Sequence, residues 1–381
     1  MIPPPERSLR SRLRRTAGVV LVNCLVLGAC FVALEVAFGN WLKPNPINRL
    51  HLIRNAELAY DVREPNTPAP RRAIYRRDQY GLRGSYRNPS QIDILTIGGS
   101  TTDQRNITEG ETWQDVLAQT LLARGKPVSV VNAGIDGQST VGHVKDFDWW
   151  FPSIPGFHAR FILVYAGIND IYVSDQQNFD DLVDETASVR GRLRTAIKER
   201  SALYSVYRLL HGIYLARVVY GAHHRTLDFN NFDWSSEPRL RNHESLLSDR
   251  LQAYSHRIEV LLEKIRGTGA SPICVTQPSH WYKKVGATVV GAVDPTTTRE
   301  DGRGYLGTLA GQRVNGLDYQ MFLSLINDQT LRTCLKEQAL TLDLAKAIEW
   351  QDDDYFDFTH NTPKGTRKIG EYLASQLEHF F

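Results

Sequence analysis

The chain has 381 residues, of which 42% are hydrophobic and 23% charged, a balance typical of a folded globular protein and not of a disordered one. Its formal net charge is +3, yet residues 1–50 hold seven Lys and Arg against two Glu, which leaves 38 of the 45 basic and 40 of the 42 acidic side chains for residues 51–381. A nucleic-acid-binding protein is expected to have a basic body, so no nucleic-acid partner is expected here.

The N-terminal segment has the pattern of a membrane anchor. Five arginines precede a run from Ala17 to Phe38 that is apolar except for Asn23 and Glu35. As a helix, this run spans about 33 Å at about 1.5 Å per residue, enough to cross the hydrocarbon core of a bilayer. Arginines on its N-terminal side predict that residues 1–16 are a basic cytoplasmic tail and that residues 17–38 cross the membrane once, which places the body in the periplasm or at the cell surface.

Two other interpretations of this segment stay open. A cleaved signal peptide has the same order of charge and apolar run, although the run is long for the apolar part of a signal peptide. The string LGAC, which ends at Cys30, resembles a bacterial lipobox, but the apolar run continues for eight residues past that cysteine. An uncleaved anchor is therefore the preferred prediction, and a lipoprotein is the weaker one.

Only two of the four cysteines, Cys274 and Cys334, lie beyond the anchor. One pair in so large a body is no disulfide framework, although an oxidising compartment would permit a bridge. Because cysteine is among the most buried residue types, we expect two buried thiols.

Beyond a Pro- and Arg-rich segment at 39–90, expected to be a linker, residues 91–381 alternate between apolar runs and amphipathic stretches. The expected strands are IDILTIG (92–98), PVSVVNAG (127–134), ARFILVYAG (159–167), SPICVTQPSH (271–280) and ALTLDLA (339–345). The expected helices lie near 113–124, 139–151, 246–266, 319–337 and 363–377. Near-continuous apolar strands that alternate with helices predict an α/β fold with a doubly wound parallel sheet.

Two stretches interrupt this alternation. Residues 174–245 are polar, rich in Arg and Tyr and without an obvious strand, which predicts a helical insertion. Its piece RGRLRTAIKER is most simply a solvated helix face, with contact to an anionic glycan or lipid as the alternative. Residues 285–316 are rich in Gly and Thr and are expected to form a mobile loop or lid.

Polar residues follow the expected strands at the edge of the sheet where ligands collect. Ser100 comes directly after the first strand, and a serine hydroxyl needs a base to act as a nucleophile. His360 could be that base, and Asp357, three residues earlier, could orient its imidazole. The hypothesis is a nucleophilic serine with a histidine and an aspartate.

Such a serine also needs donors for the oxyanion that develops on an ester carbonyl. The backbone N–H groups of Ser100 and Gly134 and the side-chain amide of Asn169 follow the first three strands and could supply them. Glycine at 134 would let the backbone approach a bound oxygen without a Cβ in the way.

The strings IGGSTT, NAGIDG, GIND and DFTHNTPKG, in this order, resemble the four blocks of the SGNH hydrolases, the GDSL-like lipase and esterase superfamily, from about Asp93 to the C-terminus. Each string alone is a weak signal for the family, but all four in this order, each after an expected strand, are a specific one. The resemblance implies Ser100 as nucleophile, Gly134, Asn169 and the Ser100 N–H as oxyanion donors, and Asp357 with His360 as the rest of the triad. It also implies a flavodoxin-like three-layer α/β/α sandwich around a five-stranded parallel sheet, with no metal and no cofactor.

The chain departs from the family pattern at Gly99, where many members have the aspartate of GDS. The triad acid is another aspartate, so the chemistry survives, but the local hydrogen bonding around Ser100 and the substrate preference of GDS-type lipases do not carry over. Membrane-anchored bacterial relatives of this kind often resemble enzymes that act on O-acetyl groups of surface glycans.

Other polar residues near the expected site have weaker claims. Thr101, His143 and His280 are candidates for substrate contact. The three aspartates at 352–354 could compete with Asp357, but successive carboxylates repel one another and are expected to form a solvated acidic loop.

The leading hypothesis is an extracytoplasmic serine ester hydrolase that removes acetyl or short acyl groups from a carbohydrate through an acyl-enzyme. If the insertion and the loop at 285–316 exclude water and admit a sugar hydroxyl, the same acyl-enzyme makes an O-acyltransferase of cell-envelope glycans. A third hypothesis is an inactive glycan-binding or scaffold protein. The expected partners are an acylated carbohydrate or other ester and, through the N-terminal helix, a membrane.

Overall fold

The structure is a computed structural model that describes residues 9–42, 44–50, 52–65, 67, 69–173, 188–214 and 226–381. The chain divides into two compact units. The smaller comprises Met1–Arg49 with Asp184–His211, and the larger comprises Leu50–Val183 with Gly212–Phe381.

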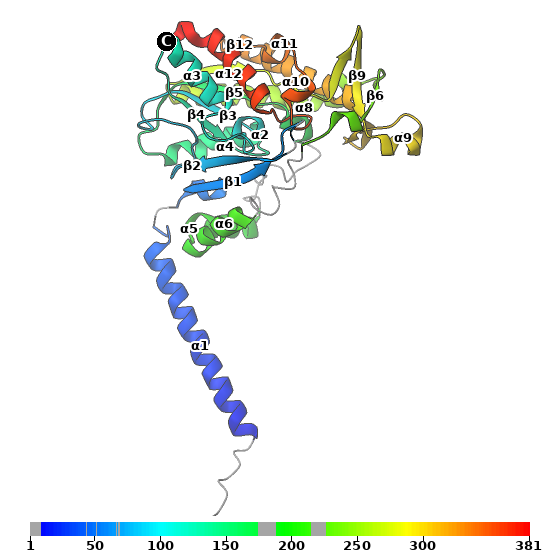
Figure 1. Ribbon diagram of the computed structural model, residues 1–381. Coiled ribbons are helices and arrows are strands. Elements are labelled where there is room, and N and C mark those ends of the chain that lie inside the picture. The colour runs from blue at the N-terminus through cyan, green and yellow to red at the C-terminus, as the bar shows by residue number, and fades with distance from the viewer. Residues whose placement is uncertain are drawn as a thin grey trace, which may run out of the picture. The chain divides into compact units, whose positions relative to one another are not determined.

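A five-stranded parallel sheet forms the centre of the larger unit (Figure 1). Its strands are β3 (Ile92–Gly98), β4 (Val130–Gly134), β5 (Ala159–Tyr165), β7 (Ser271–Val275) and β12 (Leu340–Leu342). The order across the sheet is β12-β7-β5-β3-β4, with every neighbouring pair parallel. Counted along the chain this is the order 2-1-3-4-5 of a flavodoxin-like sheet, which confirms the predicted fold class.

Helices cover both faces of this sheet. On one face lie α3 (Trp113–Ala123) and α12 (Pro363–Leu377), which pack against each other. Their apolar residues recur every fourth position, which places them on one face of each helix. They pack on alternate residues of the strands, which point to the same face of the sheet. This core contains Trp113, Leu117, Leu121, Ile369, Leu373 and Leu377 from the helices, and Ile94, Leu163, Ile273 and Leu342 from the strands. The second helical layer consists of α4 (Thr140–Trp149), α8 (His243–Gly267) and α10 (Gly316–Lys336).

Cys274 of β7 and Cys334 of α10 form a disulfide, so the expectation of two thiols was wrong. The cysteines are 60 residues apart in sequence, and only the packing of α10 on the sheet brings their Cα atoms to 6.6 Å. That separation is within the range a disulfide spans. The bond therefore ties the sheet to its second helical layer.

Replacing both cysteines with alanine is expected to cost about 4 kcal/mol of unfolding free energy, because the bond closes a loop of 60 residues in the unfolded chain. Urea unfolding of the full chain in detergent, followed by far-UV circular dichroism, measures the loss. A thiol titration of the denatured wild type is the control, with Cys24 and Cys30 as the reactive pair. Four reactive thiols in place of these two would contradict the bridge.

The segment expected to be a linker, residues 39–90, contains ordered structure. Strands β1 (Ala56–Val62) and β2 (Arg71–Arg77) form an antiparallel ribbon with one buried face. Beyond it, the backbone of Arg83 exchanges two hydrogen bonds with Asn132 of β4, at 3.0 and 2.8 Å, and so extends the sheet at its edge. The arginines that suggested a solvated linker include two that are buried in this part of the fold.

Residues 285–316 are folded and do not form the loop expected for them. Strand β9 (Thr288–Val293) pairs with β8 (Tyr282–Val285) and with β6 (Asp233–Ser235), which lies in the insertion expected to hold no strand. Next come α9 (Pro295–Asp301) and a hairpin of β10 (Gly307–Leu309) and β11 (Gln312–Val314). Strands of three to six residues between glycines are too short for a clear apolar period, so the sequence pattern missed them.

The smaller unit contains α1 (Leu9–Phe38), the turn η1 (Pro46–Arg49), α5 (Val189–Arg200) and most of α6 (Ala202–Tyr214). In α1, Thr16–Phe38 is long and apolar enough to cross a membrane, and its most apolar stretch is not buried by other parts of the protein. Helices α5 and α6 fall within the predicted insertion, whose residues 174–187 and 215–225 lie outside the described residues. Short helical turns complete the chain: α2 (Ser100–Asp103), η2 (Phe151–Ser153), η3 (Asn169–Tyr172), η5 (Phe229–Asn231), α11 (Leu344–Ala347), η6 (Asp352–Asp354) and η7 (Glu378–Phe380).

Candidate active site

Ser100 lies where the central strand β3 ends and the short helix α2 begins. Its hydroxyl is 2.7 Å from Nε2 of His360, which precedes α12 at the far end of the chain. The strand order places this point beside the reversal of the sheet, where ligands of doubly wound folds bind. The parallel sheet thus brings together two residues that are 260 positions apart.

Asp357 holds the other side of the imidazole. One carboxylate oxygen accepts from Nδ1 of His360 at 2.7 Å, and the second accepts from the backbone N–H groups of Thr359 and His360, both at 2.8 Å. A proton held on Nδ1 leaves Nε2 as the acceptor for the hydroxyl proton of Ser100. The structure therefore joins the three residues expected as a triad in one continuous hydrogen-bonded chain.

The two ionisable members of this chain have opposite pKa shifts. Burial acts to raise the pKa of Asp357, but attraction to the His360 imidazolium and the hydrogen bonds from His360 and Thr359 lower it to about 2. Burial acts to lower the pKa of His360, but the charge of Asp357 and their hydrogen bond outweigh it and raise that pKa. Asp357 is thus ionised at neutral pH, and the pKa of His360 lies above its ordinary value.

Asn169 begins η3, just after β5, and its side-chain amide lies beside Gly99, the residue before Ser100. Its Nδ2 donates to the carbonyl of Gln138 at 2.9 Å, which uses one of its two amide protons. A Cβ placed on Gly99 would lie 2.3 Å from this nitrogen. A side chain at this position therefore requires the Asn169 amide to move.

The N–H of Gly134, expected as an oxyanion donor, has a partner within the protein. Its N–H donates to Oδ1 of Asn132 at 2.8 Å, and a Cβ at this position would lie 2.3 Å from the backbone nitrogen of Asp103. The missing side chain lets α2 pack on β4 and does not open a path to a ligand.

A second glycine of the NAGIDG string was missed at the sequence level. Gly137 has φ +74°, a left-handed conformation that favours glycine, in the turn closed by the N–H of Gln138 on the carbonyl of Ile135 at 3.1 Å. The next carbonyl, that of Gln138, holds Asn169. The only sequence signal for this turn was the repeated glycine of the string.

The three candidates for substrate contact lie in different places. Thr101 lines the cavity at Ser100, and its hydroxyl accepts from Nε2 of Gln277 at 2.8 Å. His143 is fully buried, with Nδ1 2.8 Å from the side-chain oxygen of Gln138. His280 is also buried, bonded to Asp352 at 2.9 Å. Neither histidine lines the cavity, and His143 instead contacts the side chain of Gln138, whose carbonyl holds Asn169.

The acidic run at 352–354 is not a solvated loop throughout. Asp354 is fully buried and accepts from Nζ of Lys368 at 2.5 Å, while Asp352 bonds the buried His280. The carboxylates of Asp352 and Asp353 are both about half exposed, as expected for this run, and Asp353 accepts from Lys364 at 2.7 Å. The carboxylate bonded to His360 is that of Asp357.

A solvent-open cavity of about 340 Å³ lies at Ser100 and His360. Ile107 and Phe356 supply its apolar wall, and the remaining wall is largely polar, from Gln104, Arg105, Asn106, Asp136 and Asn361. Among the described residues, no group of three or more His, Cys, Asp or Glu side chains is placed to hold a metal ion.

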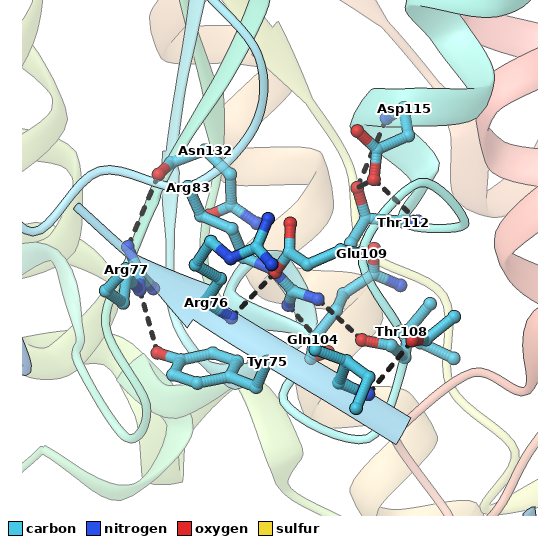
Figure 2. Close-up of polar contacts among 12 residues, drawn as sticks. Tyr75, Arg76, Arg77, Arg83, Gln104, Thr108, Glu109, Thr112, Asp115 and Asn132 are labelled. Atoms are coloured by element: carbon cyan, nitrogen blue, oxygen red, sulfur yellow. Dashed lines mark hydrogen bonds and ion pairs between the residues drawn. The ribbon is translucent and has the colours of Figure 1, made fainter. Parts of the chain in front are cut away.

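Two buried arginines hold the wall of this cavity in place. Figure 2 shows Arg77 on β2 near Tyr75, and Arg83 beside the segment that carries Gln104. Arg83 donates to the carbonyls of Asp103, Gln104 and Ile107 at 2.6, 2.9 and 2.5 Å. Arg77 donates to the hydroxyl of Tyr75 at 2.7 Å and forms an ion pair with Asp103. Sequence reasoning missed both, because they lie in the segment expected to be a linker.

Comparison with known proteins gives one family. The model of the GDSL-like Lipase/Acylhydrolase family matches residues 94–373. No match was found among curated proteins.

Several solved structures resemble the chain at low identity. One is the native aryl esterase of M. smegmatis, with 13% identity, 76% of this chain and 100% of that chain covered, and a TM-score of 0.39. Another is a catalytic mutant of an acetylxylan esterase from Geobacillus stearothermophilus, with 11% identity, 76% and 94% covered, and a TM-score of 0.39. A third is a lipolytic protein of the G-D-S-L family from Veillonella parvula, with 13% identity, 75% and 97% covered, and a TM-score of 0.36.

The family match spans both Ser100 and His360 and most of the chain, and it agrees with the motif order and the sheet described above. The chain therefore belongs to the GDSL-like lipase/acylhydrolase family and is an ester hydrolase of the SGNH type.

Proposed function

We propose that this enzyme is a membrane-anchored, extracytoplasmic serine esterase that removes acetyl or another short acyl group from a carbohydrate. The observation that carries the proposal is the hydrogen-bonded chain from Asp357 through His360 to Ser100, which opens onto a cavity with many polar residues in its wall.

In the first half of the reaction, the Ser100 oxygen attacks the ester carbonyl while Nε2 of His360 takes the hydroxyl proton. The carbonyl oxygen becomes an oxyanion that accepts from the N–H of Ser100 and the side-chain amide of Asn169. The Ser100 N–H suits this role because the first N–H groups of a helix have no partner within it. The intermediate collapses when His360 returns its proton to the departing sugar oxygen, which leaves the acyl group on Ser100.

In the second half, water replaces the sugar. His360 takes a proton from the water, whose oxygen attacks the acyl carbonyl through the same oxyanion site. The acid leaves and Ser100 regains its proton. Asp357 stays ionised throughout, since its pKa is about 2, and it stabilises the imidazolium that forms twice in each cycle.

The cavity supports a short acyl group on a hydroxylated substrate. Its large apolar lining residues are Ile107 and Phe356, which offer little apolar surface to a long lipid chain. Arg105 and Asp136 in its wall, 3.4 Å apart, offer donors and acceptors of the kind that sugar hydroxyls need.

Two observations support the proposed location. The exposed apolar span of α1 follows a basic N-terminal segment, the arrangement of an anchor with its N-terminus in the cytoplasm. The buried Cys274–Cys334 disulfide fits an oxidising compartment outside the cytoplasm.

Substitution of Gly99 with alanine tests the oxyanion assignment. The new methyl group meets the Asn169 amide at 2.3 Å, so kcat is expected to fall about 10²–10³-fold, the loss typical of one oxyanion donor. Asn169→Ala is expected to show a similar loss, and the double variant little more, because both remove the same donor. Gly267→Ala is the control, since nothing lies within 4 Å of its Cβ position. Full additivity of the two losses would contradict the assignment.

The acyl preference and the acceptor are tested together on the full chain in detergent. For p-nitrophenyl esters, kcat/KM is expected to fall as the acyl chain lengthens from acetate to octanoate, and a preference for octanoate would contradict a short-acyl esterase. With an acetylated polysaccharide, release of free acetate supports hydrolysis. Transfer of acetyl from a donor to a glycan without net release would assign the enzyme as an O-acyltransferase. Failure of a fluorophosphonate probe to label the folded protein would indicate an inactive binding protein.

A further inference from the structure

The consecutive helices α5 and α6, which are joined at Ser201 and which we call the hairpin, are fixed to the C-terminal end of the apolar helix α1. Glu35 of α1 accepts from the Ser201 hydroxyl at 2.6 Å and from the N–H groups of Ala202 and Leu203 at 3.0 and 3.1 Å. A carboxylate on the first N–H groups of α6 is a favourable cap, because those groups have no partner within the helix. The hairpin of α5 and α6 therefore begins its second helix directly on α1.

Further contacts within the smaller unit hold this arrangement. The N–H of Asn40 donates to the carbonyl of Arg200 at 2.7 Å, and the N–H of Asn45 donates to the carbonyl of Glu199 at 3.1 Å. The side chain of Glu199 forms an ion pair with Arg49. Both the chain that leaves α1 and α1 itself thus bind the junction between the two hairpin helices.

These contacts place the hairpin at the level of the membrane surface. Glu35 lies three residues before Phe38, the last residue of α1, which is about 4.5 Å along the helix axis at about 1.5 Å per residue. If Thr16–Phe38 fills the hydrocarbon layer, this carboxylate lies at its outer boundary. The hairpin junction that it holds then lies in the headgroup layer.

The two helices expose apolar stripes at this level. On α5, Val189, Leu193 and Ile197 follow one another at intervals of four residues and are all exposed. On α6, Val206, Tyr207 and Leu210 share one face and are exposed as well. Leu193 and Leu210 are 63% and 61% exposed. Such a concentration of exposed apolar side chains on neighbouring helices marks an interaction surface.

The charges beside the stripes favour lipid as the occupant. Arg190 and Arg192 are exposed on the same helix as Leu193, and the described part of α5 has a single acidic residue, the buried Glu199. Basic residues next to an apolar face are typical of helices that lie in a membrane interface, where arginines meet lipid phosphates. Tyr207 and Trp41 are also residue types that gather at that depth.

We propose that α5 and α6 are an interfacial membrane-binding element, whose apolar stripes enter the outer leaflet next to the anchor and whose arginines contact anionic headgroups. This rests on the anchor of the proposed function and is independent of the esterase chemistry. It gives the smaller unit a second attachment to the bilayer, which a single helix alone does not provide.

The test places a fluorescent label at chosen cysteines of the full chain, in a Cys24→Ser, Cys30→Ser background where the disulfide is retained. Leu193→Cys and Leu210→Cys report on the hairpin, and Leu122→Cys, 60% exposed on α3, is the matched control. The labelled proteins are reconstituted at low density into phosphatidylcholine vesicles with or without phosphatidylglycerol. Lipids with a nitroxide near the headgroup quench labels in the interface, and iodide on both sides of the bilayer quenches labels in water.

The hairpin labels are expected to emit at shorter wavelength than the Leu122 label, to lose most of their fluorescence with nitroxide lipids and little with iodide, and to respond more strongly when phosphatidylglycerol is present. Iodide quenching equal to that of the Leu122 label would overturn the proposal. Protection from both quenchers would also overturn it, since protein then covers the face. A label on the native Cys24, in a variant with only Cys30 replaced, tests the transmembrane anchor separately from the interfacial element. If lipids with a nitroxide deep in the acyl chain do not quench this label, the anchor hypothesis is wrong.

Discussion

The Ser100→Ala variant is expected to lose measurable turnover of p-nitrophenyl acetate, with kcat lower by about 10⁶-fold, the scale on which removal of a serine nucleophile acts. The reason is that the acyl-enzyme cannot form without the Ser100 oxygen, whose proton His360 accepts across 2.7 Å. The variant is also expected to lose labelling by a fluorophosphonate probe. Initial rates at saturating substrate and labelling of the full chain in detergent measure the two effects.

The control for this variant is a serine outside the site. Ser375→Ala lies on the exposed side of α12, where the hydroxyl donates only to the carbonyl of Tyr372 at 2.7 Å, and it is expected to keep wild-type turnover. Far-UV circular dichroism shows whether each variant is folded. A folded Ser100→Ala protein that turns over substrate at the wild-type rate would remove the basis of the proposed mechanism.

Replacing Asp357 with asparagine is expected to lower kcat by about 10⁴-fold and to move the acid limb of the pH profile. In the wild type, Asp357 raises the pKa of His360, so the neutral base is lost as pH falls through a value above the usual one for histidine. Without the carboxylate that pKa falls, so the remaining activity persists to lower pH. The asparagine also no longer selects the tautomer that leaves Nε2 as an acceptor. Rates of p-nitrophenyl acetate hydrolysis from acid to neutral pH measure both effects.

Asp353→Asn provides the matched control on the same loop. Its exposed carboxylate is bonded to Lys364 at 2.7 Å, so neither the plateau nor the acid limb is expected to change. If Asp357 had only a structural role, Asp357→Asn would lower the maximal rate of the pH profile without moving its acid limb. An unmoved limb in Asp357→Asn would therefore contradict the assignment of this carboxylate as the partner of His360.

Much of the fold was predictable because its signals are local. The apolar runs at 92–98, 159–167 and 271–280 became the central strands β3, β5 and β7, since a strand buried on both faces has no polar alternation. The last helix begins and ends at the residues expected, Pro363 and Leu377, because proline suits the first turn and the apolar positions recur with a helical period. Short strands such as β6 and β10 offer no such repeat, and the antiparallel part of the fold was missed.

What the sequence by itself determined was the set of chemical groups and their order along the chain. Ser100, Asn169, Asp357 and His360 each follow a strand of a parallel sheet, and parallel strands carry such residues to one edge whatever the length of chain between them.

Tertiary structure alone decided which partner each group has. It directs the N–H of Gly134 to Asn132, joins Cys274 to Cys334, and buries Arg77 and Arg83 beneath the cavity wall. A hydrogen bond or disulfide depends on directions and distances of a few ångströms between residues far apart in sequence, and neither composition nor periodicity carries that information.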